Sequence, residues 1–431
     1  MIANNLIQEL KNRTKWFDVI EITGSSDPVS FKNNRIHSVQ HKQNQGYGVR
    51  VNVGGTTGFS HTNDKSAIGD TVERAIALSA YGEREEFDLP GKTVFTGEPY
   101  DRGIEEYSPK IEIEQAEGII DSLRSEFDGI TIDLGVNRSV SAIRLINSQG
   151  FDAGYRTSHY SAGLSATYIF PDGSKVDIWE GMSSARPEPM DTPLKKVREK
   201  MSNSLKTASS RSGKMNVLFT PKAFSRLIGI LLSGINGRSV HKKISPFADK
   251  LGRELFHRGL TIADNPAIKD SPYSFPFDDE GVPASNKVLI REGRISCFIT
   301  DLKYASLLGL PPTGNGSRGY SSLPSPSFSN IIIGEGTVPV DDLMSGMDRG
   351  LLVDQFIGLG QSNTLTGDFS AALDLAFIMD KMEIAGRVKD CMITENLFRL
   401  LAGEFTLSSE REQQGSMLVP YAFFPKVNIT C

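Results

Sequence analysis

The histidines are the residues of this sequence with the widest chemical range, because an imidazole can ligate zinc or transfer a proton near neutral pH. There are six: His37, His41, His61, His159, His241 and His257. None of them is followed by glutamate. A zinc-peptidase helix of the HExxH type needs two imidazoles on one face and a glutamate beside the first as general base. The sequence therefore excludes that site.

His37 and His41 are four residues apart and resemble a ligand pair. Residues 35–42 are predicted to form a strand. Two residues at that spacing on a strand lie about 13 Å apart, at ~3.3 Å per residue. This distance is too long for one zinc ion, so we expect both to be surface residues.

Residues 314–319 match the glycine pattern GxGxxG. A dinucleotide site needs a strand before that pattern and a helix after it. Pro311 and Pro312 precede it, and Pro324 and Pro326 prevent a helix after it. Two readings remain, a flexible surface loop or a loop whose backbone contacts a ligand.

Acidic residues occur in three short groups. Asp368 follows Gly367 in a predicted β-turn, where an Asx-turn is the more common role than catalysis. Asp341 and Asp342 stand at a predicted helix start, where capping explains them. The third group is Asp278, Asp279 and Glu280. The sequence has no GxSxG or GxxxxGK[ST] motif.

Composition indicates a globular protein. The 431 residues are 39% apolar and 23% charged, with a formal net charge of −5, which argues against a nucleic-acid partner. The densest basic group, Lys195, Lys196, Arg198 and Lys200, is predicted to be a solvated helix face. Three cysteines without CxxC spacing predict no disulfide framework and a reducing compartment. We find no signal peptide or membrane span and expect a cytoplasmic protein.

The elements that must position these residues predict an α+β fold with two domains, residues 1–210 and 211–431. In the first, strands are predicted at 17–23, 35–42, 48–53, 130–136, 141–147, 161–169 and 175–180, and helices at 64–80, 111–127 and 192–205. Such a pattern favours antiparallel sheets with packed helices. Residues 207–214 are the predicted linker.

The second domain is predicted to be mostly β, as a barrel or a strongly curved sheet. Its strands are predicted at 216–219, 287–299, 330–334, 351–357, 365–379 and 381–388. An apolar helix is predicted to begin at Thr220 and Pro221 and to run to Ile235, and a short helix at 302–308 to end at Gly309.

Several segments together resemble the TldD/PmbA family, once called modulators of DNA gyrase. They are residues 30–62, 64–80, 239–266, 313–319, 349–370 and 415–429, so the likeness covers almost the whole chain. No single motif is specific, but their order and spacing are. Residues 239–266 are most similar to the PmbA, or TldE, branch.

The resemblance implies where a zinc site would be. In TldD-type members an HExxxH helix and a later cysteine bind zinc and cleave peptides. The two histidine positions correspond to Ile228 and Ser233, the glutamate position to Gly229, and the cysteine position lies near Arg411. None of these residues can hold zinc, so we expect no cofactor in this chain and zinc only in a TldD-type partner.

The leading hypothesis is therefore a PmbA/TldE-like, zinc-free subunit of a cytosolic peptidase that acts on unfolded peptides. Its partner would be a TldD-type paralogue, or a second copy of the chain. The peptide would bind by strand addition. The candidate lining residues are Gly314, Asn315, Gly316 and Ser317, with Gly367, Asp368, Phe369 and Ser370. The alternatives are a non-enzymatic homodimer that binds peptides or proteins, and an independent hydrolase with an unrecognised site.

Overall fold

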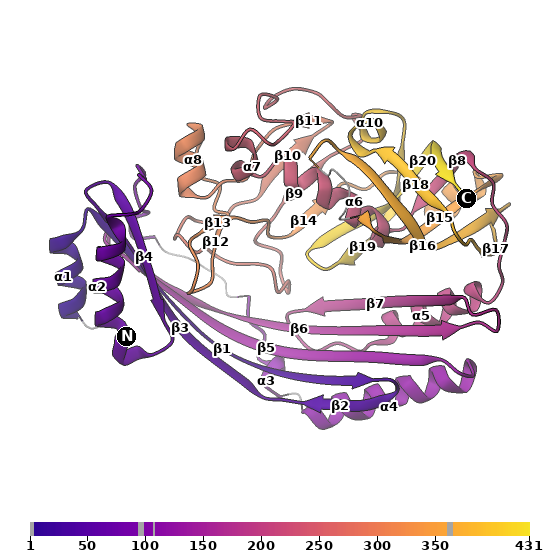
Figure 1. The fold of residues 1–431 in the computed structure, drawn as a ribbon, viewed down its shortest axis with the longest axis horizontal. Coiled ribbons are helices and arrows are strands. Elements are labelled where there is room, and N and C mark those ends of the chain that lie inside the picture. Colours follow the sequence, from indigo (N-terminus) through magenta and orange to yellow (C-terminus); the bar gives the residue numbers. More distant parts are fainter. Residues whose placement is uncertain (1–3, 94–98, 107, 360–364) are drawn as a thin grey trace.

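Seven strands of the first lobe form one antiparallel sheet in the computed structural model, which describes residues 4–93, 99–106, 108–359 and 365–431 (Figure 1). The order is β4 (Thr56–Thr62), β3 (Lys42–Val53), β1 (Trp16–Lys32), β5 (Thr131–Asn147), β6 (Asp152–Ile169) and β7 (Lys175–Ser184), with β2 (Arg35–Val39) beside β1. The predicted antiparallel sheet is confirmed.

The central strands of this sheet are longer than the sequence pattern predicted. β5 spans 17 residues and joins the two predicted strands at 130–136 and 141–147. Its polar middle, Asn137 to Ser139, pairs with β1 and β6 without interruption. The sequence pattern predicted two separate strands because a half-exposed strand segment need not carry apolar side chains.

Helices cover the two ends of the sheet and leave its middle open (Figure 1). One end carries α1 (Asn4–Arg13), the short helix η1 (Lys65–Ala67) and α2 (Ile68–Ser79); the rest of the lobe has α3 (Gly103–Glu106), α4 (Pro109–Glu126) and α5 (Asp191–Ser204). Residues 21–28 of β1 are only half-buried as a result. Ile22, in this stretch, lines a cavity together with Phe275 and Phe328 of the second lobe.

The second lobe contains a closed, barrel-like sheet. Its strands are β8 (Gly213–Phe219), β15 (Arg349–Ile357), β16 (Asp368–Asp380), β18 (Met392–Asn396) and β20 (Met417–Thr430), and pairing of β20 with β8 closes it. Helix α6 (Pro221–Gly234) packs against β20, β15 and β19. The predicted α+β class with a barrel-like second half is confirmed.

Shorter elements complete this lobe. The strands are β9 (Ile262–Asp264), β10 (Lys287–Arg291), β11 (Arg294–Ile295), β14 (Ile331–Ile333), β17 (Glu383–Arg387), β19 (Thr406–Gln414) and the separate pair β12 (Gly316–Ser317) with β13 (Ser325–Pro326). The helices are α7 (Gly237–His241), α8 (Leu302–Leu308), α9 (Val340–Ser345) and α10 (Leu397–Ala402). As predicted, α8 ends at Gly309, whose φ is +64°.

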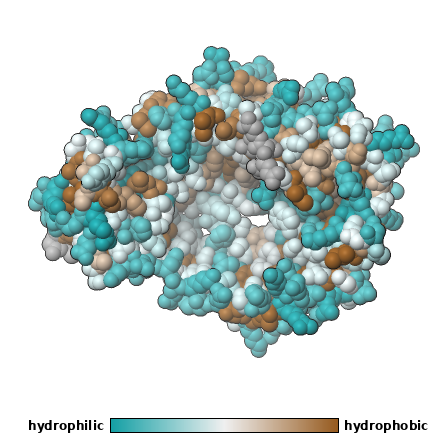
Figure 2. Space-filling model, in the orientation of Figure 1, coloured by the Kyte–Doolittle hydropathy of each residue, from teal (hydrophilic) through white to brown (hydrophobic). Residues whose placement is uncertain are grey.

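The two lobes share a hydrophobic core. One buried cluster contains Ile178 of β7 together with Leu352 of β15 and Phe377 of β16. The predicted domain boundary at residues 210 and 211 falls between α5 and β8. Figure 2 shows a hollow in the centre of the molecule, between the second lobe and the long sheet of the first. None of the described helices is long and apolar enough to cross a membrane.

Two cysteines form a disulfide, which corrects the prediction from the cysteine count. Cys391, just before β18, is bonded to Cys431, just after β20. β18 and β20 pair directly beside this bond, at Met392 and Thr430. Neighbouring strands bring together two residues 40 positions apart in the sequence, which spacing alone does not show. The cysteine count therefore no longer supports a reducing compartment.

Candidate functional site

Helix α6 begins and packs as its sequence predicts. The Thr220 hydroxyl oxygen accepts a hydrogen bond from the Ala223 N–H at 3.3 Å, and Pro221 occupies the first turn. The apolar stripe from Phe224 to Leu231 is buried in the core of the second lobe. The helix is therefore firmly fixed in the fold.

The three positions implied for a zinc site point in different directions on α6. Ile228 is fully buried, with 0% of its surface exposed. Gly229 and Ser233 are half-buried and one turn apart, so they share a face. A Cβ atom at Gly229 would meet no atom within 4 Å. The Ser233 hydroxyl donates to the Ile230 carbonyl at 2.7 Å. Only the Gly229 and Ser233 positions thus have space for a larger side chain.

Arg411, near the implied cysteine position, lies on β19 and is already paired. Its guanidinium is 2.6 Å from the Glu335 carboxylate and donates to the Ile333 carbonyl at 3.3 Å. β19 contacts α6, so the position is in the same region of the lobe. In the described part of the chain, no three His, Cys, Asp or Glu side chains gather as a metal site would require.

We expect Ile228→His to lower the free energy of unfolding by about 3 kcal/mol, because it leaves an imidazole unpartnered in the core. The matched change Ser233→His is expected to cost less than about 1 kcal/mol, since that position is half-exposed. Urea unfolding of both variants measures the difference. Equal losses in the two variants would contradict the burial of Ile228.

The glycine loop is more buried than the flexible loop predicted as one alternative. Gly314, Asn315 and Gly316 are buried, and Ser317 is exposed. The Gly316 N–H donates to Asp278 at 2.8 Å, and its carbonyl accepts from Asp279 N–H at 2.8 Å. This backbone is already hydrogen-bonded, so it has no free edge at Gly316 for strand addition.

The turn at Gly367 leads into the first residues of β16. Gly367 has a φ of +78°, and Asp368 accepts from Asn396 Nδ2 at 2.8 Å. From Asp368 to Ala371 β16 pairs with β18, whereas its first described partner on β15 is at Ala372. Phe369 is buried and Ser370 exposed.

A cavity of about 740 Å³ borders the start of β16. Asp368, Phe369 and Ser370 line it, and Ile357 and Met392 expose 58% and 43% of their surfaces nearby. The glycine loop lines a different cavity. The two groups of predicted peptide-contacting residues therefore do not share one described pocket, and their role stays a prediction.

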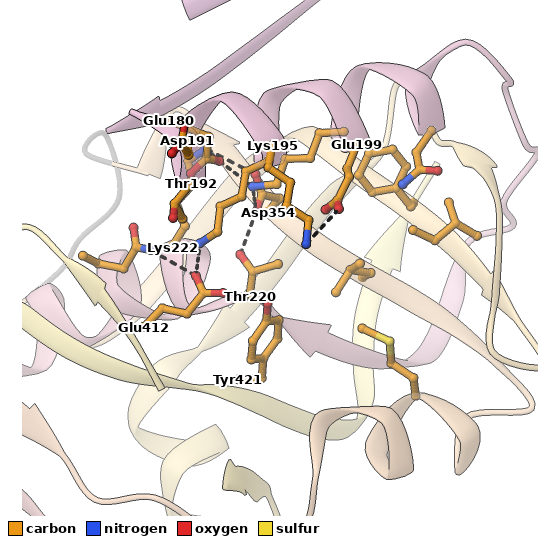
Figure 3. A pocket seen from close by; sticks show the side chains of 18 residues that line it. Glu180, Asp191, Thr192, Lys195, Glu199, Thr220, Lys222, Asp354, Glu412 and Tyr421 are labelled. Atoms are coloured by element: carbon orange, nitrogen blue, oxygen red, sulfur yellow. Dashed lines mark hydrogen bonds and ion pairs between the residues drawn. The ribbon is translucent and has the colours of Figure 1, made fainter. Parts of the chain in front are cut away.

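A second cavity, of about 460 Å³, lies where the lobes meet (Figure 3). α5 and β7 of the first lobe and α6, β15, β19 and β20 of the second supply its walls. Lys200 Nζ lies 2.5 Å from Glu180 and 2.7 Å from Asp354. Lys200 thus belongs to a buried cluster, which corrects its prediction as part of a solvated face. Lys195, 75% exposed, fits that prediction.

Lys222, in the first turn of α6, closes the cluster. Its ammonium is 2.9 Å from Glu180 and 3.3 Å from Asp354, and it donates to Gln355 at 2.7 Å. The Thr220 hydroxyl donates to Asp354 at 2.9 Å. Burial lowers the pKa of Lys222. Burial alone would raise the pKa of Asp354, but Lys200 and Lys222 hold it below its ordinary value. The side chains of Glu180, Lys200, Lys222 and Asp354 form the interlobe ion cluster. This cluster links both lobes to the start of α6.

A third group of charges is buried where β1 and β3 meet loops of the second lobe. Arg50 of β3 pairs with Asp18 of β1 and, at 2.8 Å, with Glu280 of the second lobe. Arg318 pairs with Asp18 at 2.8 Å. Burial raises the pKa of Asp279 to about 6 and, together with the Glu280 charge, that of Asp301 to about 7.

Sequence reasoning named Asp278, Asp279 and Glu280 but gave them no role. The only signal was three adjacent acids in a segment otherwise rich in Pro, Ser and Phe. Glu280 pairs with Arg50, which lies 230 residues away in the chain. No local pattern could connect them.

The fold defines a class: a two-lobed α+β protein whose second lobe packs a capped helix against a barrel-like sheet. A model of the PmbA/TldA metallopeptidase C-terminal domain matches residues 212–431, just over half of the chain, and a model of domain 1 matches residues 17–79. The chain belongs to the PmbA/TldA metallopeptidase family.

Similar proteins span the whole chain. An uncharacterized protein of Methanocaldococcus jannaschii is 27% identical over 94% of both chains. The metalloprotease PmbA of Escherichia coli O157:H7 is 26% identical over 93% of this chain and 90% of its own. The crystal structure of TldE from Thermococcus kodakarensis superposes with a TM-score of 0.92 at 22% identity, over 99% of each chain. This last likeness shows the fold.

Proposed function

We propose that this chain is the zinc-free subunit of a two-subunit peptidase, in which a TldD-type paralogue supplies the zinc and cleaves unfolded peptides. The observation that carries the proposal is α6. The helix keeps its cap, its packing and its place beside β19, yet Ile228, Gly229 and Ser233 occupy the positions implied for the ligands and base. A helix that packs in this way but lacks the zinc ligands and the catalytic base suits a non-catalytic subunit.

The cavity beside the start of β16 supports peptide binding. An extended peptide would bind by strand addition through backbone hydrogen bonds, which are largely independent of sequence. Asp368, Phe369 and Ser370 line this cavity, and the exposed Ile357 and Met392 offer the peptide's side chains apolar contacts. The glycine loop would contribute side-chain contacts only, because the backbone of Gly316 is already paired.

Location and partner rest on the resemblance alone. We place the complex in the cytoplasm, with the paralogue as partner, or a second copy of the chain if no paralogue exists. We assign no role in binding DNA, because the net charge of −5 provides no basic surface for it.

Co-expression with a TldD-type paralogue is expected to give a stable complex that cleaves an unstructured peptide at least tenfold faster than the paralogue alone. The pure chain is expected to bind no stoichiometric zinc and to cleave nothing. Size-exclusion chromatography, metal analysis and peptide cleavage measure these three properties. The matched control replaces the paralogue's motif glutamate, which should abolish cleavage but not assembly.

Three outcomes would contradict the proposal. Failure to assemble, with equal cleavage by the paralogue alone, removes the subunit role. Stoichiometric zinc with activity in the pure chain makes it an independent hydrolase. A stable self-dimer that binds peptide but ignores the paralogue supports the non-enzymatic homodimer.

A further inference from the structure

A cavity of about 320 Å³ lies between the long sheet and the loops of the second lobe. Its floor is one row across three neighbouring strands, because Ile22 pairs with Ile143 and Ile143 pairs with Tyr155. Phe275 and Phe328 form its other apolar walls. The volume is at the lower end for ligand pockets, which span about 300–1,000 Å³.

One end of this cavity is acidic. Asp278 and Asp279 both line it, but they differ in availability. Asp278 accepts three backbone N–H groups, from Glu280, Val282 and Gly316, so it holds the turn together. Asp279 is half-buried and accepts from the Arg318 N–H at 2.8 Å through one oxygen. Its carboxylate is the group that a ligand could reach.

Carboxylates outnumber cations near this end, where Arg318 is the one cationic side chain among the described lining residues. Four carboxylates, Asp18, Asp278, Asp279 and Glu280, surround two guanidiniums, Arg50 and Arg318. Arg50 contacts Asp18 and Glu280, and Arg318 contacts Asp18. In the described part of the chain, neither Asp278 nor Asp279 forms an ion pair with a lysine or arginine side chain. The ionised Asp279 is stabilised by hydrogen bonds from the Arg318 N–H and Ser317 and by the Arg318 charge, but burial still disfavours it, so a further cation in this cavity would stabilise it.

Tyr155 adds a second, independent feature. Its ring lies edge-on to Phe277 at 5.1 Å, and its hydroxyl forms no hydrogen bond with any described residue. Burial raises the pKa of this phenol well above its ordinary value, so it stays protonated. An unpaired phenol oxygen beside a carboxylate can accept from an N–H donor, and an aromatic wall attracts a cation.

We infer that this cavity is a subsite for the cationic side chain of a lysine or arginine in a bound peptide. Asp279 is the counter-ion, Tyr155 is a hydrogen-bond acceptor, and the apolar walls hold the methylene stem. The inference rests on the proposed function for the source of the ligand, though not for the cavity itself. It gives the predicted loop residues Gly316 and Ser317, which line the cavity, a role in side-chain recognition.

The test uses n-butylguanidinium, a side-chain mimic, titrated into the full-length chain and followed by NMR line shifts. We expect saturable millimolar binding at pH 7.5, and none for butyrate or n-butanol. Asp279→Asn is expected to weaken binding at least tenfold and Tyr155→Phe two- to fivefold. Asp152→Asn is the matched control, because this exposed β6 carboxylate lies near Tyr155 in the chain and should change nothing.

A pH titration of the wild-type chain tests the same residue without mutation. Burial raises the pKa of Asp279 to about 6, against the opposing effects of Arg318. The carboxylate binds the cation only when ionised, so affinity should fall as pH drops through 6, roughly tenfold from pH 7 to 5. The charged groups facing Asp279 are Asp278 and Glu280 on its own loop and Arg318 on the opposite loop.

Labelled peptides that differ only by arginine or norleucine at one position separate this inference from the proposed function. Arginine is expected to improve binding at least fivefold. Absence of saturable mimic binding, or unchanged binding in Asp279→Asn, overturns the subsite. Peptides that bind equally well with norleucine also overturn it while the proposed function stands. If the side-chain mimic binds but neither peptide does, the subsite stands and the proposed function is contradicted.

Discussion

Replacing Lys222 with methionine is expected to lower the free energy of unfolding by about 3–5 kcal/mol. The side chain is 4% exposed, and methionine has a similar length, so packing is largely kept. What changes is charge. Glu180 and Asp354, 5% and 1% exposed, would retain only Lys200 as a cation. Urea unfolding followed by circular dichroism measures the loss.

The matched control for this prediction is Lys195→Met on α5. That side chain is 75% exposed and lies 3.8 Å from Glu199, so its loss should cost less than about 1 kcal/mol. If Lys222→Met also costs less than about 1 kcal/mol, the interlobe ion cluster does not hold α6 in place. Because Lys222 stands in the first turn of α6, the variant should also weaken assembly with a TldD-type partner if the proposed function is right.

Arg50→Met is expected to cost about 3–5 kcal/mol for a similar reason. Arg50 is 2% exposed and donates to Asp18 and Glu280, which are both fully buried. Without it, Arg318 alone would face Asp18, and Glu280 would lose its cation. Guanidinium chloride would screen these charges, so urea is the better denaturant.

Arg144→Met on β5 is the control for this second prediction. Arg144 makes two hydrogen bonds of 2.9 Å to Asp152, a bidentate pair, but its side chain is 33% exposed and that of Asp152 is 51% exposed. We expect a loss below about 1 kcal/mol. Similar losses for Arg50→Met and Arg144→Met would show that burial does not determine how much these ion pairs contribute to the free energy of unfolding.

The local elements followed from the sequence where periodicity was strong. The stripe of α6, its Thr220 cap and the Gly309 end of α8 are short-range features, and the structure has them where they were predicted. The long strands were only partly predicted. The segment from Asn137 to Ser139 carries no apolar alternation, because its buried position is taken by Arg138, which pairs with the buried Glu112.

The candidate site divides in the same way. The absence of a His-Glu dipeptide is a property of the sequence alone. The structure adds that Ile228 belongs to the core while Gly229 and Ser233 are half-exposed, a distinction that depends on which face of α6 packs. The ion pairs of Lys200, whose side chain is 18% exposed, could not be inferred from its basic neighbours, since Glu180 and Asp354 come from other elements.

By itself the sequence determined the composition, the missing metallopeptidase motif, the α+β class and most helices, because these depend on residue type and short spacing. Only the tertiary structure decided the Cys391–Cys431 disulfide, the interlobe ion cluster and the acidic cavity at Asp279. Each of these joins residues from elements that are distant in the chain. The tertiary fold brings these residues together, and the low dielectric of the interior then strengthens the electrostatic interactions between their charges.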